Sequence, residues 1–246
     1  MVVNGVSQGA RSADARRRPG SERGGSPSRR PRSSRRSGSR FPMSAMLGVC
    51  LPDRLHLMSD GAVFCEGRPG VLVGQMEKII WIPGMAAAFI ARGAWLANER
   101  FLAACAGVGS FDDLIGGLDV VLDTFDEAMR EANHIDTELL IGGWSDELDR
   151  PRLLYRAMHD RTPGVEPGNV YEVTAFTTGD AGLLPSDLAS FQPADGIASF
   201  EAARRAEVDG GSHIGVAVYH AQIAAGATPR TVKVHEWDDR IGALIA

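Results

Sequence analysis

Ser44 is the first residue whose position could make it a nucleophile. It follows Met43, and a side chain as small as that of serine lets methionine aminopeptidase remove an initiator methionine. If translation starts at Met43, Ser44 therefore becomes residue one. A free α-amino group has a reference pKa of about 7.7 to 8.0, so a useful fraction of it is neutral near neutral pH. Such an amine can take the proton of the hydroxyl group in its own residue, and one residue then supplies both nucleophile and base.

Two charged residues downstream, Asp60 and Lys78, have the types that would serve this nucleophile, and Asp209 is a further candidate. An ammonium group beside a serine hydroxyl lowers the pKa of that hydroxyl, and a carboxylate would orient the lysine and balance its charge. Each residue also has a structural interpretation. Asp60 with the following glycine is an ordinary turn dipeptide, Lys78 suits the edge of a strand, and Ser44 suits a surface. Spacing alone leaves both interpretations open.

The cysteines and histidines do not indicate a metal site or a disulfide framework. The six histidines are scattered, without an HxxxH or HxH pattern. Cys50, Cys65 and Cys105 are odd in number and lack CxxC spacing. No apolar run is long enough to span a membrane, and no secretory signal is present. We therefore expect reduced thiols, no metal, no cofactor, no membrane partner and a cytoplasmic location.

The elements that must position Ser44, Asp60 and Lys78 read as antiparallel β structure. A short apolar run, AMLGVC, precedes the Pro52-Asp53 turn, and Leu55 and Leu57 alternate with polar neighbours after it, which is typical of a hairpin. Two apolar runs then flank Pro83-Gly84 as strand, turn and strand. The expected β segments of the first third are residues 45–50, 54–61, 62–70, 78–84 and 86–93.

Composition then changes to helix-forming residues and back to strands. Ser110 and Asp113 resemble a capping box that opens a long amphipathic helix over residues 111–134. Other helices are expected at 95–107 and at 199–209, the latter capped by Ser199. Later strands are expected at 137–144, 152–158, 170–180, 213–223 and 231–237. Strands and helices are thus segregated rather than alternating, which favours an α+β layered domain with antiparallel sheets.

Residues 1–42 differ from the remainder of the chain. They carry eleven arginines against only Asp14 and Glu22, although the whole chain has a net charge of −5. Their Arg, Ser, Gly and Pro composition cannot bury enough apolar surface to order a fold, so we expect a disordered arm. Our interpretation is that translation starts at Met43 or that the arm is removed, which leaves 43–246 as a single domain.

Taken in order, the candidate residues resemble the proteasome β-subunit family of the N-terminal nucleophile (Ntn) hydrolase superfamily. Ser44 in SAMLGV falls where that family has its freed N-terminal Thr, and Asp60 in LMSDGAV matches its Asp at the same interval. Lys78 in EKIIWIP matches its Lys, after a slightly longer loop. Gly93 in AFIARG matches the strand-ending Gly whose backbone helps to build the oxyanion hole.

The C-terminal half extends the resemblance to nearly all of the chain from Ser44 onward. EAARRAEVDGGSHIGVAVY resembles the family's helix, Asp, Ser and strand, which assigns Asp209 and Ser212 to the site. Thr178 in TTGD occupies the place of a supporting Ser. The resemblance implies a four-layer αββα sandwich of two antiparallel sheets flanked by helices.

The sequence also departs from the family's pattern. The nucleophile position holds Ser rather than Thr, and Met43 replaces the Gly that commonly precedes self-cleavage, which favours methionine excision. Thr178 replaces a Ser, and two glycines separate Asp209 from Ser212.

Three functions remain open at this stage. The resemblance implies an Ntn amidohydrolase, a proteasome-like peptidase acting on peptides or small amides, and a homo-oligomer that could form rings. Because the family includes non-catalytic members, a silent scaffold or assembly subunit is the alternative. The third is nucleic-acid association through the arginine arm. We do not expect it, because the arm has no aromatic residue to stack on bases before Phe41.

Overall fold

Two five-stranded antiparallel sheets form the centre of the computed structural model, which describes residues 44–65, 68–160, 162–206 and 213–245. The arginine-rich arm lies outside the described residues. The first sheet has the strand order β10-β1-β2-β11-β12. Its strands are β1 (Met46–Cys50), β2 (Leu55–Asp60), β10 (Ala175–Thr177), β11 (Ala217–Ile223) and β12 (Thr231–Glu236).

The second sheet has the order β5-β6-β7-β8-β9, with every neighbouring pair antiparallel. Its strands are β5 (Ile79–Trp81), β6 (Ala87–Arg92), β7 (Glu138–Ser145), β8 (Arg150–Ala157) and β9 (Val170–Glu172). A separate hairpin joins β3 (Ala62–Cys65) to β4 (Arg68–Gln75). The expected hairpins are confirmed, whereas β4 as a strand of eight residues was not expected.

The segment 170–180, expected as a single strand, belongs to both sheets. Its first part is β9, which pairs with β8 in the second sheet, and its last part is β10, which pairs with β1 in the first. An apolar and β-branched run shows that a chain is extended but not which strand lies beside it. The pairing therefore depends on tertiary contacts that the local pattern does not contain.

The helices depart from expectation in two places. The long helix after Ser110 is divided at Gly117 into α2 (Phe111–Gly116) and α3 (Leu118–Glu131), because Gly117 interrupts the helix with φ −103° and ψ 14°. Ser199 is not a cap. It lies buried inside α4 (Pro193–Ala206), which begins six residues earlier. Helix α1 (Leu96–Ala104) and the Ser110 capping box are confirmed. Short 3₁₀ turns complete the elements at Ala181–Leu183 and Leu188–Ser190.

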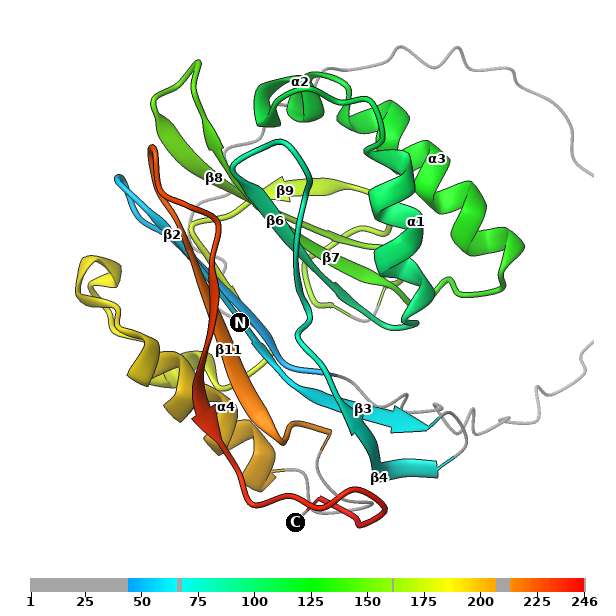
Figure 1. Ribbon diagram of the computed structural model, residues 1–246, viewed down its shortest axis with the longest axis vertical. Coiled ribbons are helices and arrows are strands. Elements are labelled where there is room, and N and C mark those ends of the chain that lie inside the picture. Colours follow the sequence, from blue (N-terminus) through cyan, green and yellow to red (C-terminus); the bar gives the residue numbers. More distant parts are fainter. Residues whose placement is uncertain (1–43, 66–67, 161, 207–212, 246) are drawn as a thin grey trace, which may run out of the picture. The chain divides into compact units, whose positions relative to one another are not determined.

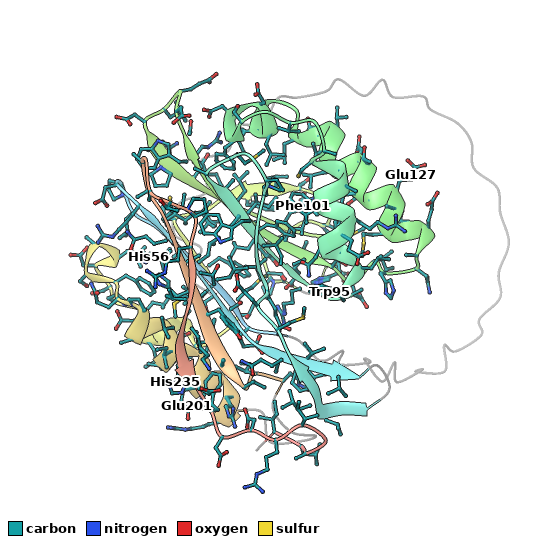
Figure 2. All side chains as sticks on the ribbon, in the orientation of Figure 1. His56, Trp95, Phe101, Glu127, Glu201 and His235 are labelled. Carbon is teal, nitrogen blue, oxygen red and sulfur yellow. The ribbon has the colours of Figure 1, made fainter. Side chains whose placement is uncertain are left out.

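Three apolar cores join these elements into four layers (Figure 1). The first core packs α1, α2 and α3 on the outer face of the second sheet, with Phe101 at its centre (Figure 2). The second core lies between the two sheets and includes Leu55, Leu140 and Tyr155. The third packs α4 on the outer face of the first sheet through Phe200 and Met58. The order of layers is therefore helix, sheet, sheet, helix.

Within the described part of the chain, no helix is both long and apolar enough to cross a membrane.

Candidate active site

Lys78 joins Ser44 to Asp60 at the edge of the two sheets. Its Nζ donates one hydrogen bond to Ser44 Oγ, 2.7 Å away, and another to Asp60 Oδ1, 2.9 Å away. Ser44 precedes β1, Asp60 ends β2, and Lys78 immediately precedes β5. Three segments separated in sequence thus bring a hydroxyl, an ammonium and a carboxylate together, which are the three groups that the sequence predicted as partners.

The β1–β2 hairpin explains why Asp60 lies beside Ser44. Its antiparallel register pairs Met46 with Ser59, so the next residues outward, Ala45 and Asp60, also face each other. The backbone N–H of Asp60 donates to the Ala45 carbonyl at 3.2 Å. In return, the Ala45 N–H donates to Asp60 Oδ1 at 2.9 Å. The hairpin therefore holds the Asp60 carboxylate against Ala45, the residue that follows Ser44 in the sequence.

The Asp60 carboxylate is fully buried and receives further donors. The N–H of Ala62 lies 3.0 Å from Oδ2, and the N–H of Gly215 lies 3.4 Å from the same oxygen. With Ala45 and Lys78, four donors surround the two oxygens. Because hydrogen bonds to the charged form stabilise a buried carboxylate, this arrangement holds Asp60 as an anion facing Lys78.

Burial acts on both members of this ion pair. It raises the pKa of the Asp60 carboxyl and lowers the pKa of the Lys78 ammonium, and the attraction between the two groups opposes both shifts. The nearby charge of Arg92 lowers the pKa of Lys78 further. Lys78 therefore gives up a proton more readily than an exposed lysine, while it still contacts the Ser44 hydroxyl.

No described contact joins Ser44 to Thr178 or Gly93, two other predicted residues. Thr178 Oγ1 accepts the N–H of Met46 at 3.0 Å, and the N–H of Thr178 donates to the Met46 carbonyl. It therefore fixes the start of β1, two residues after Ser44. Gly93 directly follows β6 and has φ 126°, and a Cβ there would lie 2.8 Å from the Asp136 carbonyl oxygen. Both features require glycine at that position.

A buried charge pair next to Lys78 was missed from the sequence. Arg92 donates to Glu138 at 2.6 Å, and Glu138 also accepts from Thr162 and lies 3.2 Å from His159. Burial alone would raise the pKa of Glu138, but His159 and Arg92 lower it to about 2. Arg92 and Glu138 are directly opposite in the β6–β7 ladder. Their opposite charges would indicate the pair only once that register is known.

Asp209 and Ser212, assigned to the site by the sequence, lie outside the described residues. Cys50 and Cys105 are free thiols. Among the residues that the structure describes, no cluster of three or more His, Cys, Asp or Glu side chains could hold a metal ion.

Three solved structures share this architecture. They are a Gly-1 mutant of Anbu from Hyphomicrobium sp. strain MC1 (TM-score 0.57, 16% identity), Anbu from the same strain (0.55, 15%), and Anbu (ancestral beta-subunit) from Yersinia bercovieri (0.56, 11%). The alignments cover 80%, 79% and 78% of this chain and 88%, 88% and 87% of those chains. The chain has an Ntn hydrolase fold. No family model and no curated protein matches the sequence.

The observed fold agrees with the fold class that the sequence predicted. The predicted α+β class, with two antiparallel sheets between helical layers, is confirmed by the layers and by the Anbu likeness. Identities of 11 to 16% support the resemblance to proteasome β-subunits at the level of the fold alone.

Proposed function

We propose that this protein is an Ntn amidohydrolase, a proteasome-like peptidase whose nucleophile is Ser44 at a freed N-terminus. The observation that carries the proposal is the hydrogen bond of 2.7 Å from Lys78 Nζ to Ser44 Oγ, with Asp60 holding the same ammonium. A positive charge at this distance favours the alkoxide form of the hydroxyl. The arrangement is therefore suited to activating Ser44 for attack.

The reaction proceeds in two stages. Ser44 Oγ attacks the carbonyl carbon of an amide while the Ser44 α-amine takes the hydroxyl proton. The oxyanion that forms is held by backbone N–H groups near Gly93, and the amine then gives the proton to the leaving nitrogen. Water, activated by the same amine, attacks the ester and releases the acid. Thr178 fixes the start of β1, two residues after Ser44, and Asp209 and Ser212 are carried into the proposal from the sequence resemblance alone.

The alternative is an assembly subunit without activity. One observation favours a role in assembly: one of the similar structures is named an ancestral beta-subunit. A subunit needs the fold but not a free Ser44 amine. In either case we propose that the protein forms a homo-oligomer, with ring assembly as its expected form.

Comparison with two Ser44 variants tests the proposed activity. The protein purified from cells is assayed against a broad panel of peptides and small amides, beside Ser44→Ala and Ser44→Thr. We expect Ser44→Ala to lose at least about a thousandfold in kcat/KM and Ser44→Thr, which retains a hydroxyl, to keep measurable activity. Equal rates for wild type and Ser44→Ala would exclude hydrolysis by this residue.

A further inference from the structure

Val216 adopts a backbone conformation that a β-branched residue rarely takes. Its φ is +68°, and the N–H of Ala217 donates to the carbonyl of Gly215 at 2.9 Å. A hydrogen bond across two residues with positive φ at the central residue defines a γ-turn of the strained kind. Such strain persists only where surrounding contacts enforce it. Since the side chain of Val216 is 7% exposed, the turn is also buried.

This γ-turn contacts the candidate active site directly. The N–H of Gly215 points to Asp60 Oδ2 at 3.4 Å, and the carbonyl of Gly215 accepts the N–H of Gly61 at 3.3 Å. The N–H of Gly61 also donates to the Ala217 carbonyl at 2.8 Å. The turn therefore contacts the end of β2 at the carboxylate of Asp60, the residue that holds Lys78, and at the next residue, Gly61.

Asp239, close to the C-terminus, holds the other side of the turn. Its Oδ2 accepts the N–H of Val216 at 2.8 Å. Both oxygens also accept from Arg204 of α4, at 2.7 and 2.6 Å, in a bidentate pair. Burial alone would raise the pKa of the Asp239 carboxyl, but the hydrogen bonds from Arg204 and Val216 lower it. Asp239 is thus a charged acceptor held in one orientation.

Neighbouring groups hold the Asp239 carboxylate in one position. A Cβ on Gly215 would lie 2.7 Å from Asp239 Oδ2, so the carboxylate packs against the bare backbone of the turn. The N–H of Trp237 donates to the Val216 carbonyl at 2.9 Å, and the Trp237 ring lies under the Arg204 guanidinium, 5.0 Å away. Glu201 of α4 accepts the Trp237 indole N–H at 2.6 Å, and the His235 ring packs against the Trp237 ring; Figure 2 labels Glu201 and His235.

We propose that Asp239 is a positioning residue for the active site. By binding the N–H of Val216 it holds the γ-turn, and the turn keeps the Gly215 N–H on Asp60 and so fixes the carboxylate that orients Lys78 against Ser44. The inference rests on the proposed function for its effect on catalysis. Asp239 is thus linked to the Asp60 carboxylate through two hydrogen bonds of the turn, from the N–H groups of Val216 and Gly215.

The kinetic test uses the full chain with Asp239→Ala, and with the exposed neighbour Asp238→Ala as a matched control. We expect Asp239→Ala to lower kcat by roughly three- to tenfold with KM little changed, as for the loss of one hydrogen bond at a catalytic group. Without its third N–H donor, the Asp60 carboxyl should have a higher pKa. Below the rise set by the Ser44 amine, the acid limb of the pH profile should therefore gain a second, steeper fall that begins at higher pH than in wild type. Asp238→Ala should change neither.

Glycine at position 216 provides a rescue. Glycine adopts positive φ without strain, so Val216→Gly combined with Asp239→Ala should regain most of the lost kcat and the original acid limb. A merely structural role for Asp239 would not be rescued by removing a further buried side chain. If Asp239→Ala is folded and retains the wild-type kcat and pH profile, or if Val216→Gly restores nothing, the proposal is overturned.

Amide hydrogen exchange separates this proposal from the proposed function. Exchange of the Gly215 and Gly61 N–H groups should accelerate in Asp239→Ala and not in Asp238→Ala, whether or not the protein hydrolyses anything. If wild type shows no Ser44-dependent hydrolysis, the proposed function fails, and the exchange rates still decide whether Asp239 holds the turn. Unchanged exchange would overturn the proposal. If Asp239→Ala does not fold, Asp239→Asn, which keeps one acceptor for Val216, is measured in the same way.

Discussion

At the scale of single residues, the site depends on the buried ion pair between Asp60 and Lys78. The two members of this pair have different numbers of hydrogen-bond partners. Asp60 has three backbone donors besides Lys78, whereas Lys78 has Ser44 and Asp60 as its described partners. Removing one member of a buried pair leaves an uncompensated charge, which costs about 3 to 5 kcal/mol. Removing both members leaves no uncompensated charge.

A double-mutant cycle on this pair should be strongly non-additive. We expect Asp60→Asn and Lys78→Met each to lower the free energy of unfolding by about 3 kcal/mol, and the double variant to lose clearly less than the sum. Urea unfolding of all four proteins measures this. Additive losses would mean that the two groups do not interact as an ion pair. Arg130→Met, which removes a largely exposed partner of Asp126, serves as the control and should lose under about 1 kcal/mol.

The proposed base makes activity depend on pH in a defined direction. A free Ser44 amine must be neutral to accept the hydroxyl proton, so kcat/KM should rise with pH through about 7 to 8, the ordinary range of an α-amino group. Acetylating the N-terminus should abolish the activity. A flat profile over this range, or an acetylated protein with full activity, would rule out the amine as the base.

The sequence could predict the residues that a family pattern marks, and it missed those that only the fold brings in. Ser44, Asp60 and Lys78 stand at recognisable intervals, and the structure places them within hydrogen-bond distance. Asp239 lies far from all of them in sequence and acts through backbone atoms of Gly215 and Val216. A backbone N–H donor does not depend on the type of residue that carries it. Contacts of this kind therefore cannot be predicted from residue types and their spacing.

At the scale of elements, a buried histidine pair lies between the first sheet and the segment leading into α4. His56 of β2 and His220 of β11 are joined by a hydrogen bond of 2.9 Å, and Phe191 covers the His56 ring. His56, labelled in Figure 2, is 4% exposed. Burial, then His220 and Arg54, lower the pKa of His56 from 6.5 to about 4, and burial also lowers the pKa of His220.

This pair predicts a loss of stability in mild acid. Because the folded-state pKa of His56 is below the unfolded value, the unfolded chain binds more protons between about pH 4 and 6.5. Stability should therefore fall as the pH drops through that window, by about 3 kcal/mol in all. His56→Gln, which cannot gain the proton, should lose much of this dependence in urea unfolding at several pH values. His134→Gln, outside the pair, should retain it, and equal pH dependence in both variants would contradict the account.

The division of the helix after Ser110 shows what local patterns can and cannot predict. The apolar spacing from Leu114 to Met129 correctly predicts the buried face that packs on the second sheet. The break at Gly117 is a change of backbone conformation at one residue, which the spacing of apolar residues does not indicate, so spacing alone extended one helix through it. Capping is local, and the Ser110 cap was predicted because its partner stands three residues away.

Ser110→Ala should cost about 1 kcal/mol of unfolding free energy, since the first turn of α2 loses its side-chain acceptor. Thr124→Ala, in the exposed middle of α3, is the comparison and should change stability by less than about 0.5 kcal/mol. Thermal unfolding measures both. Equal effects of the two substitutions would show that the cap contributes nothing specific.

At the scale of the whole molecule, the four layers place the starts and ends of strands from both sheets at one edge. Ser44 before β1, Asp60 at the end of β2 and Lys78 before β5 meet there, and the C-terminal segment reaches the same place through Asp239. The order of strands and helices predicted the α+β class. The pairing of two sheets face to face came from the family resemblance, because segment order alone is compatible with other layered arrangements.

The central claim is that Ser44 becomes the first residue of the working protein, and an intact-mass measurement tests it most directly. The protein is purified from cells without added tags, its mass is determined, and it is treated with an electrophile that acylates active serines. The account predicts a chain that begins at Ser44 with an unblocked amine and carries one adduct on Ser44. A chain that retains residues before Ser44, or a blocked Ser44 amine, with no adduct would contradict it.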